Sequence, residues 1–429
     1  MSSLSWERMM IMGIKELLKG ISDCSCGKQH LCPIEHVVIG SNVLQSLENI
    51  CEKYNSILMV SDQNTYRVCG KEVAEILGDK ITTSIMFETG DAPLIPDEEA
   101  IAAIQAKFID GVDLVLGVGS GVINDLCKIV SFERELPYYI VATAPSMDGY
   151  ASVGSALILK GMKVTLNAAP PKAIIADTRV LKDAPMDMLQ AGYGDIIGKY
   201  SCLNDWKLSA LINGEYFCQQ VYDLTYQTTD RVKTLASGVV ARDEETIGAL
   251  MEALVIVGIA MAFVGNSRPA SGSEHHFSHY FEITGILNDA PYLAHGIDVV
   301  YAAVLTAKIR GEILLKTPVR RTFDEGEWKK EVERIYLTSA EEVVALQKKM
   351  GWYWEDNSEK VLPKWEEIKA VLSEAPTEAE MLEMLAAVHM NYQEFVDLYG
   401  QAKIDDGVLY AKDLKDRYSV LWLYYEFFR

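Results

Sequence analysis

The sequence lacks an excess of positive charge. Lys and Arg number 40 against 61 Asp and Glu, a formal net charge of −21. A chain this acidic is not expected to bind nucleic acid or an anionic membrane surface. Long uninterrupted apolar runs are also lacking, because Glu252 interrupts the stretch 247–264, which we predict to be a buried helix rather than a membrane span. The first 19 residues contain Glu7 and Glu16 and only a short apolar patch, so we expect no secretion signal and a cytoplasmic protein.

Cysteine is sparse and scattered, which favours reduced thiols over a disulfide framework. One segment differs: Cys24-Ser25-Cys26 is followed by His30 and Cys32. This segment is similar to a small metal knuckle, but it has no second Cys-x-x-Cys half. Two interpretations stay open, a zinc site and a surface arm with ordinary thiols, and the sequence favours the arm.

A chain of 429 residues exceeds the usual size of a single core, so we predict two domains. Residues 1–185 form the first, an α/β domain preceded by an arm at 1–34, and residues 186–429 form an all-helical second domain. Apolar runs of strand length alternate with helical segments in the first domain. The predicted strands are 36–39, 56–61, 83–87, 112–118, 138–143 and 173–176, with a hairpin of 155–159 and 164–166 turning at 160–161.

A glycine-rich turn directly follows the predicted strand 112–118. Gly119, Ser120 and Gly121 lie between this strand and a helical segment, although the pattern is not a strict G-x-G-x-x-G. Such a turn lets backbone N–H groups approach a pyrophosphate. Asp62 ends another predicted strand, where a carboxylate can bind an adenosine ribose or simply cap the next helix. Both interpretations of Asp62 stay open.

The segment 143–152 follows the predicted strand 138–143 and is rich in small hydroxyl side chains. The carboxyl ends of parallel strands are where open α/β sheets bind ligands. We therefore expect this segment to line the ligand site.

Histidine is scarce, yet three of the seven fall within His275–His279, and His295 follows shortly after. On a helix His275 and His279 share one face, whereas His276 is turned about 100° away from them. Imidazoles are common ligands of divalent metals. Upstream, Asp195 lies among glycines; taken alone it is predicted to be a helix N-cap, but with His275 and His295 it suggests an Asp-His-His metal site with one open position.

Together these residues resemble a known enzyme family. Asp195, the run Glu274-His275-x-Phe277-Ser278-His279, Ala294-His295-Gly296 and the loop Thr143-Ala144-Pro145-Ser146-x-Asp148-Gly149 are similar to sn-glycerol-1-phosphate dehydrogenase of the bacterial AraM type. That family belongs with the iron-type alcohol dehydrogenases, glycerol dehydrogenase and dehydroquinate synthase. The resemblance covers about residues 35–310 and implies a Rossmann-like nucleotide domain followed by a helical metal domain.

The resemblance also implies roles for single residues. Metal, nickel or zinc, would be held by Asp195, His275 and His295; substrate would be contacted by Asp148 and His279; the dinucleotide NAD(P)H would be contacted by Gly119, Ser120, Gly121, Thr143, Ser146 and Ser152. Asp148, Asp195 and His279 would be the catalytic set. A homo-oligomer, with a dimer favoured, is implied as well. The family's glycine turn has three successive glycines, whereas this chain has Gly119, Ser120 and Gly121.

The implied reaction is the NAD(P)H-dependent reduction of dihydroxyacetone phosphate to sn-glycerol 1-phosphate, with the carbonyl polarised by the metal. Two alternatives are a glycerol dehydrogenase and a dehydroquinate-synthase-like cyclase, the latter disfavoured because that branch usually has Glu where Asp195 stands. A phosphate substrate needs cationic partners in an acidic protein. Lys199 and Arg268 are the nearest basic residues in sequence, and each is equally well explained as part of an ion pair.

Overall fold

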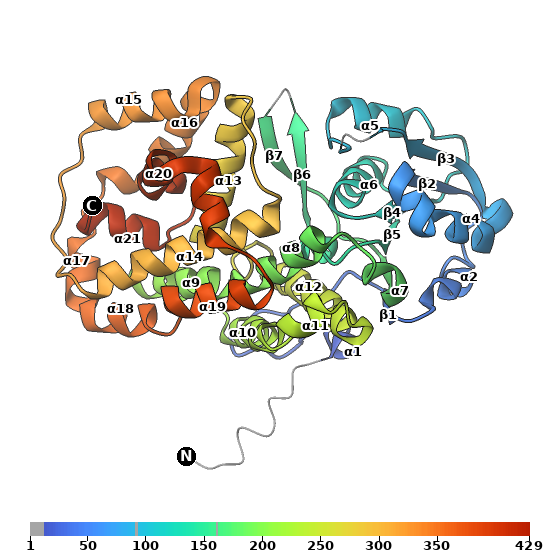
Figure 1. Cartoon of the computed structure of the whole chain (residues 1–429), viewed down its shortest axis with the longest axis horizontal. Coiled ribbons are helices and arrows are strands. Elements are labelled where there is room, and N and C mark those ends of the chain that lie inside the picture. Colours follow the sequence, from blue (N-terminus) through green and yellow to red (C-terminus); the bar gives the residue numbers. More distant parts are fainter. Residues whose placement is uncertain (1–12, 91–92, 160–161) are drawn as a thin grey trace, which may run out of the picture. The chain divides into compact units, whose positions relative to one another are not determined.

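The computed structural model describes residues 13–90, 93–159 and 162–429. The chain divides into two compact units (Figure 1), one of Met1–Ile196 with Asp223–Asn266 and one of Ile197–Tyr222 with Ser267–Arg429. This division differs from the predicted boundary at residue 185, because helices after that point return to the first unit. The cause is α12 (Glu244–Val264), which packs on η4 (Asp148–Ala151), α7 (Thr178–Leu181) and β1 (His36–Gly40).

The first unit is built on a six-stranded parallel sheet with the order β1-β8-β5-β4-β2-β3. Its central strands read as continuous apolar runs because helices cover both faces and bury every residue. All six predicted strands are present. The strands are β1, β2 (Ile57–Asp62), β3 (Ile81–Phe87), β4 (Leu114–Gly119), β5 (Tyr138–Ala142) and β8 (Ala173–Asp177). Strand β8, the last of these strands in the sequence, lies inside the sheet, because it pairs with β1 on one side and with β5 on the other.

A separate antiparallel hairpin, β6 (Gly154–Leu159) and β7 (Met162–Asn167), matches the predicted one, and its turn at 160–161 lies outside the described residues. The helices of this unit are short apart from α6, α8, α10 and α12. They are α1 (Ile14–Leu17), α2 (Ser46–Ile50), α3 (Gln63–Thr65), α4 (Lys71–Leu77), α5 (Glu98–Gln105), α6 (Gly121–Glu133), α7, α8 (Met186–Ile197), α10 (Gln219–Lys233), α11 (Ala236–Val240) and α12, with single turns η1 (Val43–Gln45), η2 (Tyr66–Gly70), η3 (Gly78–Lys80) and η4. The last residue of α8 and the first residues of α10 belong to the segment Ile197–Tyr222, which is part of the second unit.

The strand order places a topological switch point between β2 and β4. From β2 the chain moves outward to β3 and then returns to the other side of β2 as β4. The loops that leave β2 and β4 therefore diverge and open a crevice at the carboxyl ends of these strands, which is where doubly wound sheets bind nucleotides. Ser61 pairs with Val118 in register, so Asp62 and Gly119 emerge side by side at this crevice.

Helix α12 is long and apolar enough to cross a membrane by length and composition alone, but 83% of its most apolar window is buried. As predicted, it is a core helix. The Asp243 side chain caps its N-terminus by accepting from Thr246 N, and Gly265 ends it in the left-handed conformation.

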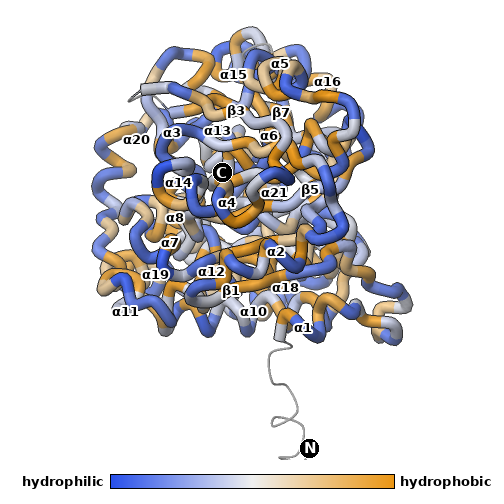
Figure 2. The backbone as a smooth tube through the Cα atoms, turned by 90° about the vertical axis from the view of Figure 1, so that its right-hand side faces the viewer, coloured by the Kyte–Doolittle hydropathy of each residue, from blue (hydrophilic) through white to orange (hydrophobic). Residues whose placement is uncertain are grey.

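The second unit is all-helical, as predicted for most of this region. Figure 2 shows hydrophilic and hydrophobic residues alternating along the chain. The helices of this unit are α9 (Lys199–Asn213), α13 (Ser273–Leu287), α14 (His295–Leu314), α15 (Glu325–Tyr336), α16 (Ala340–Met350), α17 (Ser358–Val361), α18 (Trp365–Leu372), α19 (Glu378–Ala387), α20 (Tyr392–Tyr410, broken at Gly400) and α21 (Val420–Phe427), with single turns η5 (Leu337–Ser339), η6 (Trp352–Trp354), η7 (Leu362–Lys364) and η8 (Ala411–Leu414).

The core of the second unit contains buried charge near its C-terminus. Glu426 on α21 accepts a hydrogen bond from Asn357 Nδ2 at 2.8 Å, and burial raises its pKa to about 7. Lys412 is fully buried against the ring of Tyr425, 3.8 Å from Nζ to the ring centroid, and burial lowers its pKa to about 8.

We expect Glu426→Gln to stabilise the protein at pH 8 but not at pH 4.5. Because the folded pKa exceeds the unfolded value of 4.5, the protonated carboxyl favours the folded state, and this stability is lost as pH rises from about 4.5 through 7. The loss is at most about 3 kcal/mol, which the neutral amide avoids. The check is the thermal unfolding midpoint of both proteins at both pH values. Glu367→Gln, at an exposed position of α18, is the matched control and should shift neither midpoint. An equal effect of Glu426→Gln at both pH values would contradict the assignment.

Candidate functional site

The turn between β4 and α6 has the geometry that the sequence predicted for a pyrophosphate site. Gly119 is the last residue of β4, Ser120 is the N-cap residue of α6, and Gly121 opens the helix. A Cβ on Gly119 would lie 2.6 Å from the Ile123 side chain, so glycine is needed for the close approach of helix and strand. The N–H groups in the first turn of a 13-residue helix such as this one are able to bind an anion.

Asp62 is a helix cap, one of its two predicted roles. Its Oδ1 accepts from Asn64 N and Thr65 N, both at 2.8 Å, and Thr65 Oγ1 accepts from Asp62 N in return, which is a capping box. The cap occupies one carboxylate oxygen, so it is compatible with the predicted ribose contact by the other.

The loop 143–152 lies next to this turn. Thr143 N donates to Gly119 O at 3.1 Å, which ties the end of β5 to the end of β4. Tyr150 OH donates to Ala144 O at 2.7 Å and closes the loop on itself. Ser146, half-buried, is hydrogen-bonded to the Tyr150 hydroxyl. The predicted contacts Thr143 and Ser146 therefore belong to one rigid loop beside the glycine turn.

Asp195 lies in the last turn of α8, so the prediction that it caps a helix N-terminus is wrong. Its side chain is fully buried, and Oδ2 accepts from the backbone N of Asp148 at 2.8 Å. Two predicted catalytic residues are thus joined by a direct hydrogen bond. The bond fixes the Asp195 carboxylate and places negative charge beside the Asp148 backbone.

Two glycines that the sequence did not single out for this purpose allow the loop to seat against its helices. A Cβ on Gly192 of α8 would overlap the Pro145 carbonyl oxygen, and a Cβ on Gly258 of α12 would lie 2.6 Å from Ala151 Cβ and 2.9 Å from Asp148 O. Gly192 precedes Asp195 by three residues in the sequence, but only the fold shows that it packs directly against the Pro145 carbonyl oxygen.

We expect Gly192→Ala to lower both stability and turnover. The added methyl group must push the loop away from α8, which lengthens the Asp148 N to Asp195 Oδ2 bond and costs about 1–3 kcal/mol. The measurement is the thermal unfolding midpoint together with the rate per folded molecule. Gly311→Ala on α14 is the control, since a Cβ there meets nothing within 4 Å and alanine favours helix. A Gly192→Ala protein with unchanged midpoint and rate would show that the loop does not need this contact.

Lys128 is a feature of the site that sequence reasoning missed. This buried residue of α6 donates from Nζ to Gly149 O at 2.9 Å and Gly154 O at 2.7 Å, and it forms an ion pair with Asp125 at 3.6 Å. Burial lowers its pKa, and the charge of Asp125 opposes that effect. Ser152, predicted to contact the cofactor, also belongs to this cluster, because its Oγ accepts from Lys128 Nζ at 3.3 Å and donates to Gly149 O. The Asp125–Lys128 spacing of three on one helix face was the available signal.

In the second unit, the N-terminus of α13 is held by buried carboxylates. Asp205 of α9 accepts from Ser273 N through Oδ2 and from Val420 N through Oδ1, both at 2.7 Å. Burial, and then the charge of Glu274, raises the Asp205 pKa to about 6. A Cβ on Gly272 would lie 2.6 Å from Cys202 Cα, so α9 and α13 approach closely only because residue 272 is glycine.

Three histidines of this unit lie close together, as the sequence predicted. The ring centroids of His275 and His295 lie 5.0 Å apart, and that of His279 lies 6.3 Å from the first and 5.9 Å from the second. His275 is buried, whereas His279 and His295 are half-buried. His276 points elsewhere, into the core near Ser419, and burial lowers its pKa well below the usual value.

The donors of this cluster fit a divalent metal. Glu274 Oε1 lies 2.7 Å from His275 Nδ1, and a carboxylate only accepts, so Nδ1 carries the proton and the Nε2 lone pair is left to bind. One ligand nitrogen of His275 lies within 4.8 Å of one of His295. Ser278 Oγ is 3.3 Å from His295 Nδ1 and can orient the second ring in the same way.

The two basic residues considered for a phosphate have internal partners. Arg268 is buried, forms a bidentate ion pair with Glu215 and donates to Tyr418 O, which supports the ion-pair interpretation. Lys199, at the start of α9, is also buried, and its Nζ donates to Ala270 O at 3.1 Å.

Comparison with known proteins agrees with this geometry. Residues 38–185 match the family model of iron-containing alcohol dehydrogenases. Glycerol-1-phosphate dehydrogenase [NAD(P)+] of Halalkalibacterium halodurans is 35% identical over 69% of this chain and 76% of its own length, and that of Pyrococcus furiosus is 31% identical over 64% and 78%.

Solved structures show the same fold. Sulfoacetaldehyde reductase from Bifidobacterium kashiwanohense, in complex with NAD+, has a TM-score of 0.58 at 12% identity and covers 89% of this chain and 92% of its own. Glycerol dehydrogenase from Schizosaccharomyces pombe has a TM-score of 0.53 at 15% identity, covering 90% and 94%. The chain is thus an NAD(P)-dependent, metal-requiring oxidoreductase, and it belongs to the glycerol-1-phosphate dehydrogenase family within the iron-containing alcohol dehydrogenases.

Proposed function

We propose that the protein reduces dihydroxyacetone phosphate to sn-glycerol 1-phosphate with NADH or NADPH. The observation that carries the proposal is the His275–His295 pair, in which Glu274 fixes the binding tautomer of His275. The sequence identity of 35% to a glycerol-1-phosphate dehydrogenase supports a phosphorylated three-carbon substrate. A role as a glycerol dehydrogenase rests on fold likeness at 15% identity and is the weaker alternative.

Asp195, His275 and His295 are the proposed metal ligands, and nickel or zinc is the proposed metal. When bound, such a metal supplies Lewis-acid polarisation of the substrate carbonyl. Glu274 keeps the His275 Nε2 lone pair available, and the backbone N of Asp148 holds Asp195 Oδ2 in place. These supporting bonds orient the ligands before substrate arrives.

The dinucleotide is proposed to lie at the switch point of the sheet. The N-terminus of α6 at Gly119–Gly121 binds the pyrophosphate, Asp62 the adenosine ribose, and Thr143 and Ser146 the nicotinamide half. Ser152 acts through the Lys128 cluster that shapes the loop.

Asp148 and His279 are proposed to act on substrate. His279 is half-buried, and its ring centroid lies 6.3 Å from that of His275 and 5.9 Å from that of His295, so it is the proposed donor of the proton that the product oxygen needs. Lys199, four residues after Asp195, is the proposed partner of the substrate phosphate. A homodimer and a cytoplasmic location complete the proposal.

The test follows NAD(P)H oxidation with dihydroxyacetone phosphate in metal-free protein and after adding nickel or zinc. We expect turnover only in the metal-loaded protein. Equal turnover in protein that atomic spectrometry shows to be metal-free would refute the metal-dependent mechanism.

A further inference from the structure

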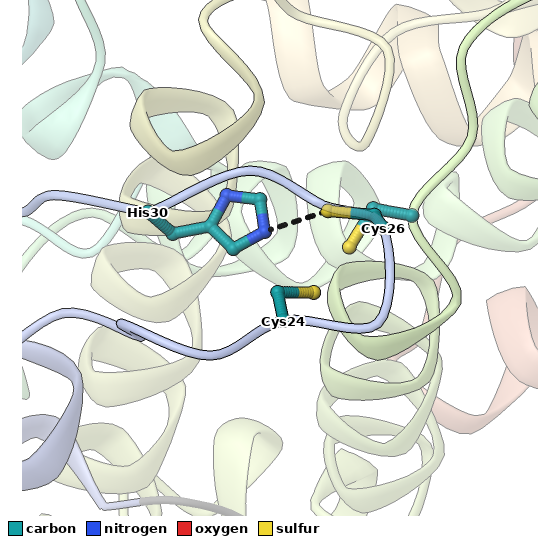
Figure 3. Close-up of side chains that lie close together, drawn as sticks. Cys24, Cys26 and His30 are labelled. Atoms are coloured by element: carbon teal, nitrogen blue, oxygen red, sulfur yellow. Dashed lines mark hydrogen bonds between the residues drawn. The ribbon is translucent and has the colours of Figure 1, made fainter.

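A second set of metal-ligating side chains lies in the first unit, on the segment that precedes the sheet. Cys24, Cys26 and His30 converge there (Figure 3), with ligand atoms within 4.8 Å of one another. Cys26 Sγ and His30 Nε2 are 3.4 Å apart. The two cysteines are half-buried and His30 is fully buried, whereas most of the other residues of this segment are exposed, as in the surface arm that the sequence favoured. The structure also selects His30 rather than Cys32 as the third member.

The tautomer of His30 is fixed by a backbone group. His30 Nδ1 lies 2.7 Å from Phe263 O, near the C-terminus of α12. A carbonyl only accepts, so Nδ1 carries the proton, and the Nε2 lone pair faces Cys26. A ring whose second nitrogen donates to a carbonyl is the usual arrangement of a metal-binding histidine.

The backbone closes this segment into a compact loop. Ile21 and His30 exchange two hydrogen bonds, Ile21 N to His30 O at 2.8 Å and His30 N to Ile21 O at 2.9 Å. Within the loop, Gly27 N donates to Cys24 O at 2.9 Å, and Gly27 has a φ of 80°. Such a turn brings two cysteines that are two residues apart onto one side of the chain.

An ordinary alternative is that His30 only caps α12 while Cys26 makes a weak thiol hydrogen bond. The separation of Cys26 Sγ and His30 Nε2 fits either interpretation, and the ligand types favour a metal. With Zn–S and Zn–N bonds of about 2.3 and 2.0 Å, tetrahedral coordination puts sulfur and nitrogen about 3.5 Å apart. The observed 3.4 Å matches this separation. The ligand types, two thiols and an imidazole, are those of structural zinc sites and differ from the proposed active-site set.

We propose that Cys24, Cys26 and His30 bind a structural zinc ion distinct from the catalytic metal. Structural zinc takes four ligands, so one further donor would complete the site. The site would fasten residues 21–30 to the end of α12, the helix whose Gly258 supports the Asp148 loop.

The experiment substitutes cobalt for zinc in the full-length protein and measures metal content. We expect two metal equivalents per chain and an intense near-ultraviolet band from thiolate-to-cobalt charge transfer, which an Asp-His-His site cannot produce. Cys26→Ser should lose the band and one equivalent while keeping the other. Cys32→Ser is the matched control, a thiol of the same segment, and should keep both.

Two outcomes would overturn the proposal. One is a wild-type protein without the thiolate band, and the other is a Cys26→Ser protein with the band and both equivalents. If Cys26→Ser fails to fold, the wild-type spectrum and its cobalt-to-chain ratio decide alone. The result is independent of the proposed reaction, because His275→Ala should remove the other equivalent and leave the thiolate band in place.

Discussion

Replacing His275 by Ala is expected to remove one metal equivalent and lower kcat/KM by at least about a thousand-fold. The reason is that His275 presents an Nε2 lone pair, fixed by Glu274, and is one of the three proposed metal ligands. Lewis-acid polarisation contributes several kcal/mol to carbonyl reduction, and every factor of ten corresponds to about 1.4 kcal/mol. Metal content by atomic spectrometry and initial rates measure the two effects separately.

His36→Ala is the control for this experiment. His36 lies exposed on β1, so its loss should change neither metal content nor rate. A His275→Ala protein that folds and keeps both its metal and its rate would show that the metal is held elsewhere. Loss of rate with full metal content would instead make His275 a substrate-contacting residue.

The second large effect concerns the phosphate of the substrate. We expect kcat/KM for dihydroxyacetone phosphate to exceed that for dihydroxyacetone by two to four decades. Both compounds share the carbonyl to be reduced, and they differ in a dianion that needs prepared donors. A few charge-assisted hydrogen bonds supply about 3–5 kcal/mol, and a site built to donate them to a dianion loses that stabilisation when the phosphate is missing.

Parallel rate measurements with the two compounds, at equal metal loading, test this expectation. Part of the loss should appear in kcat, because phosphate binding also orients the carbonyl. Comparable efficiency with both compounds would identify the enzyme as a glycerol dehydrogenase.

Much of the fold could be predicted because apolar runs and glycine turns are local signals. The strands around Met59, Leu116 and Ile175 and the helices that carry His275 and His295 lie where the hydrophobic pattern indicated. The domain division was not predictable in this way. Helix α12 is apolar all round, and nothing local shows that it packs on η4 and β1 rather than within the helical unit.

The same limit applies to the sites. The spacing of His275 and His279 on a helix predicted the histidine cluster, but the position of Asp195 in α8 and the contact of Gly192 with Pro145 O depend on tertiary packing. The sequence placed both His30 and Cys32 in one segment with Cys24 and Cys26, but it could not choose between them, because the Ile21–His30 backbone pairing that brings His30 beside Cys26 is visible only in the structure.

The stereochemistry of the product tests the central claim most directly. Metal-loaded protein, dihydroxyacetone phosphate and NADH or NADPH are incubated, and the glycerol phosphate formed is resolved into its enantiomers. Our account predicts sn-glycerol 1-phosphate. Formation of sn-glycerol 3-phosphate would contradict it, because hydride would then have reached the opposite face of the carbonyl.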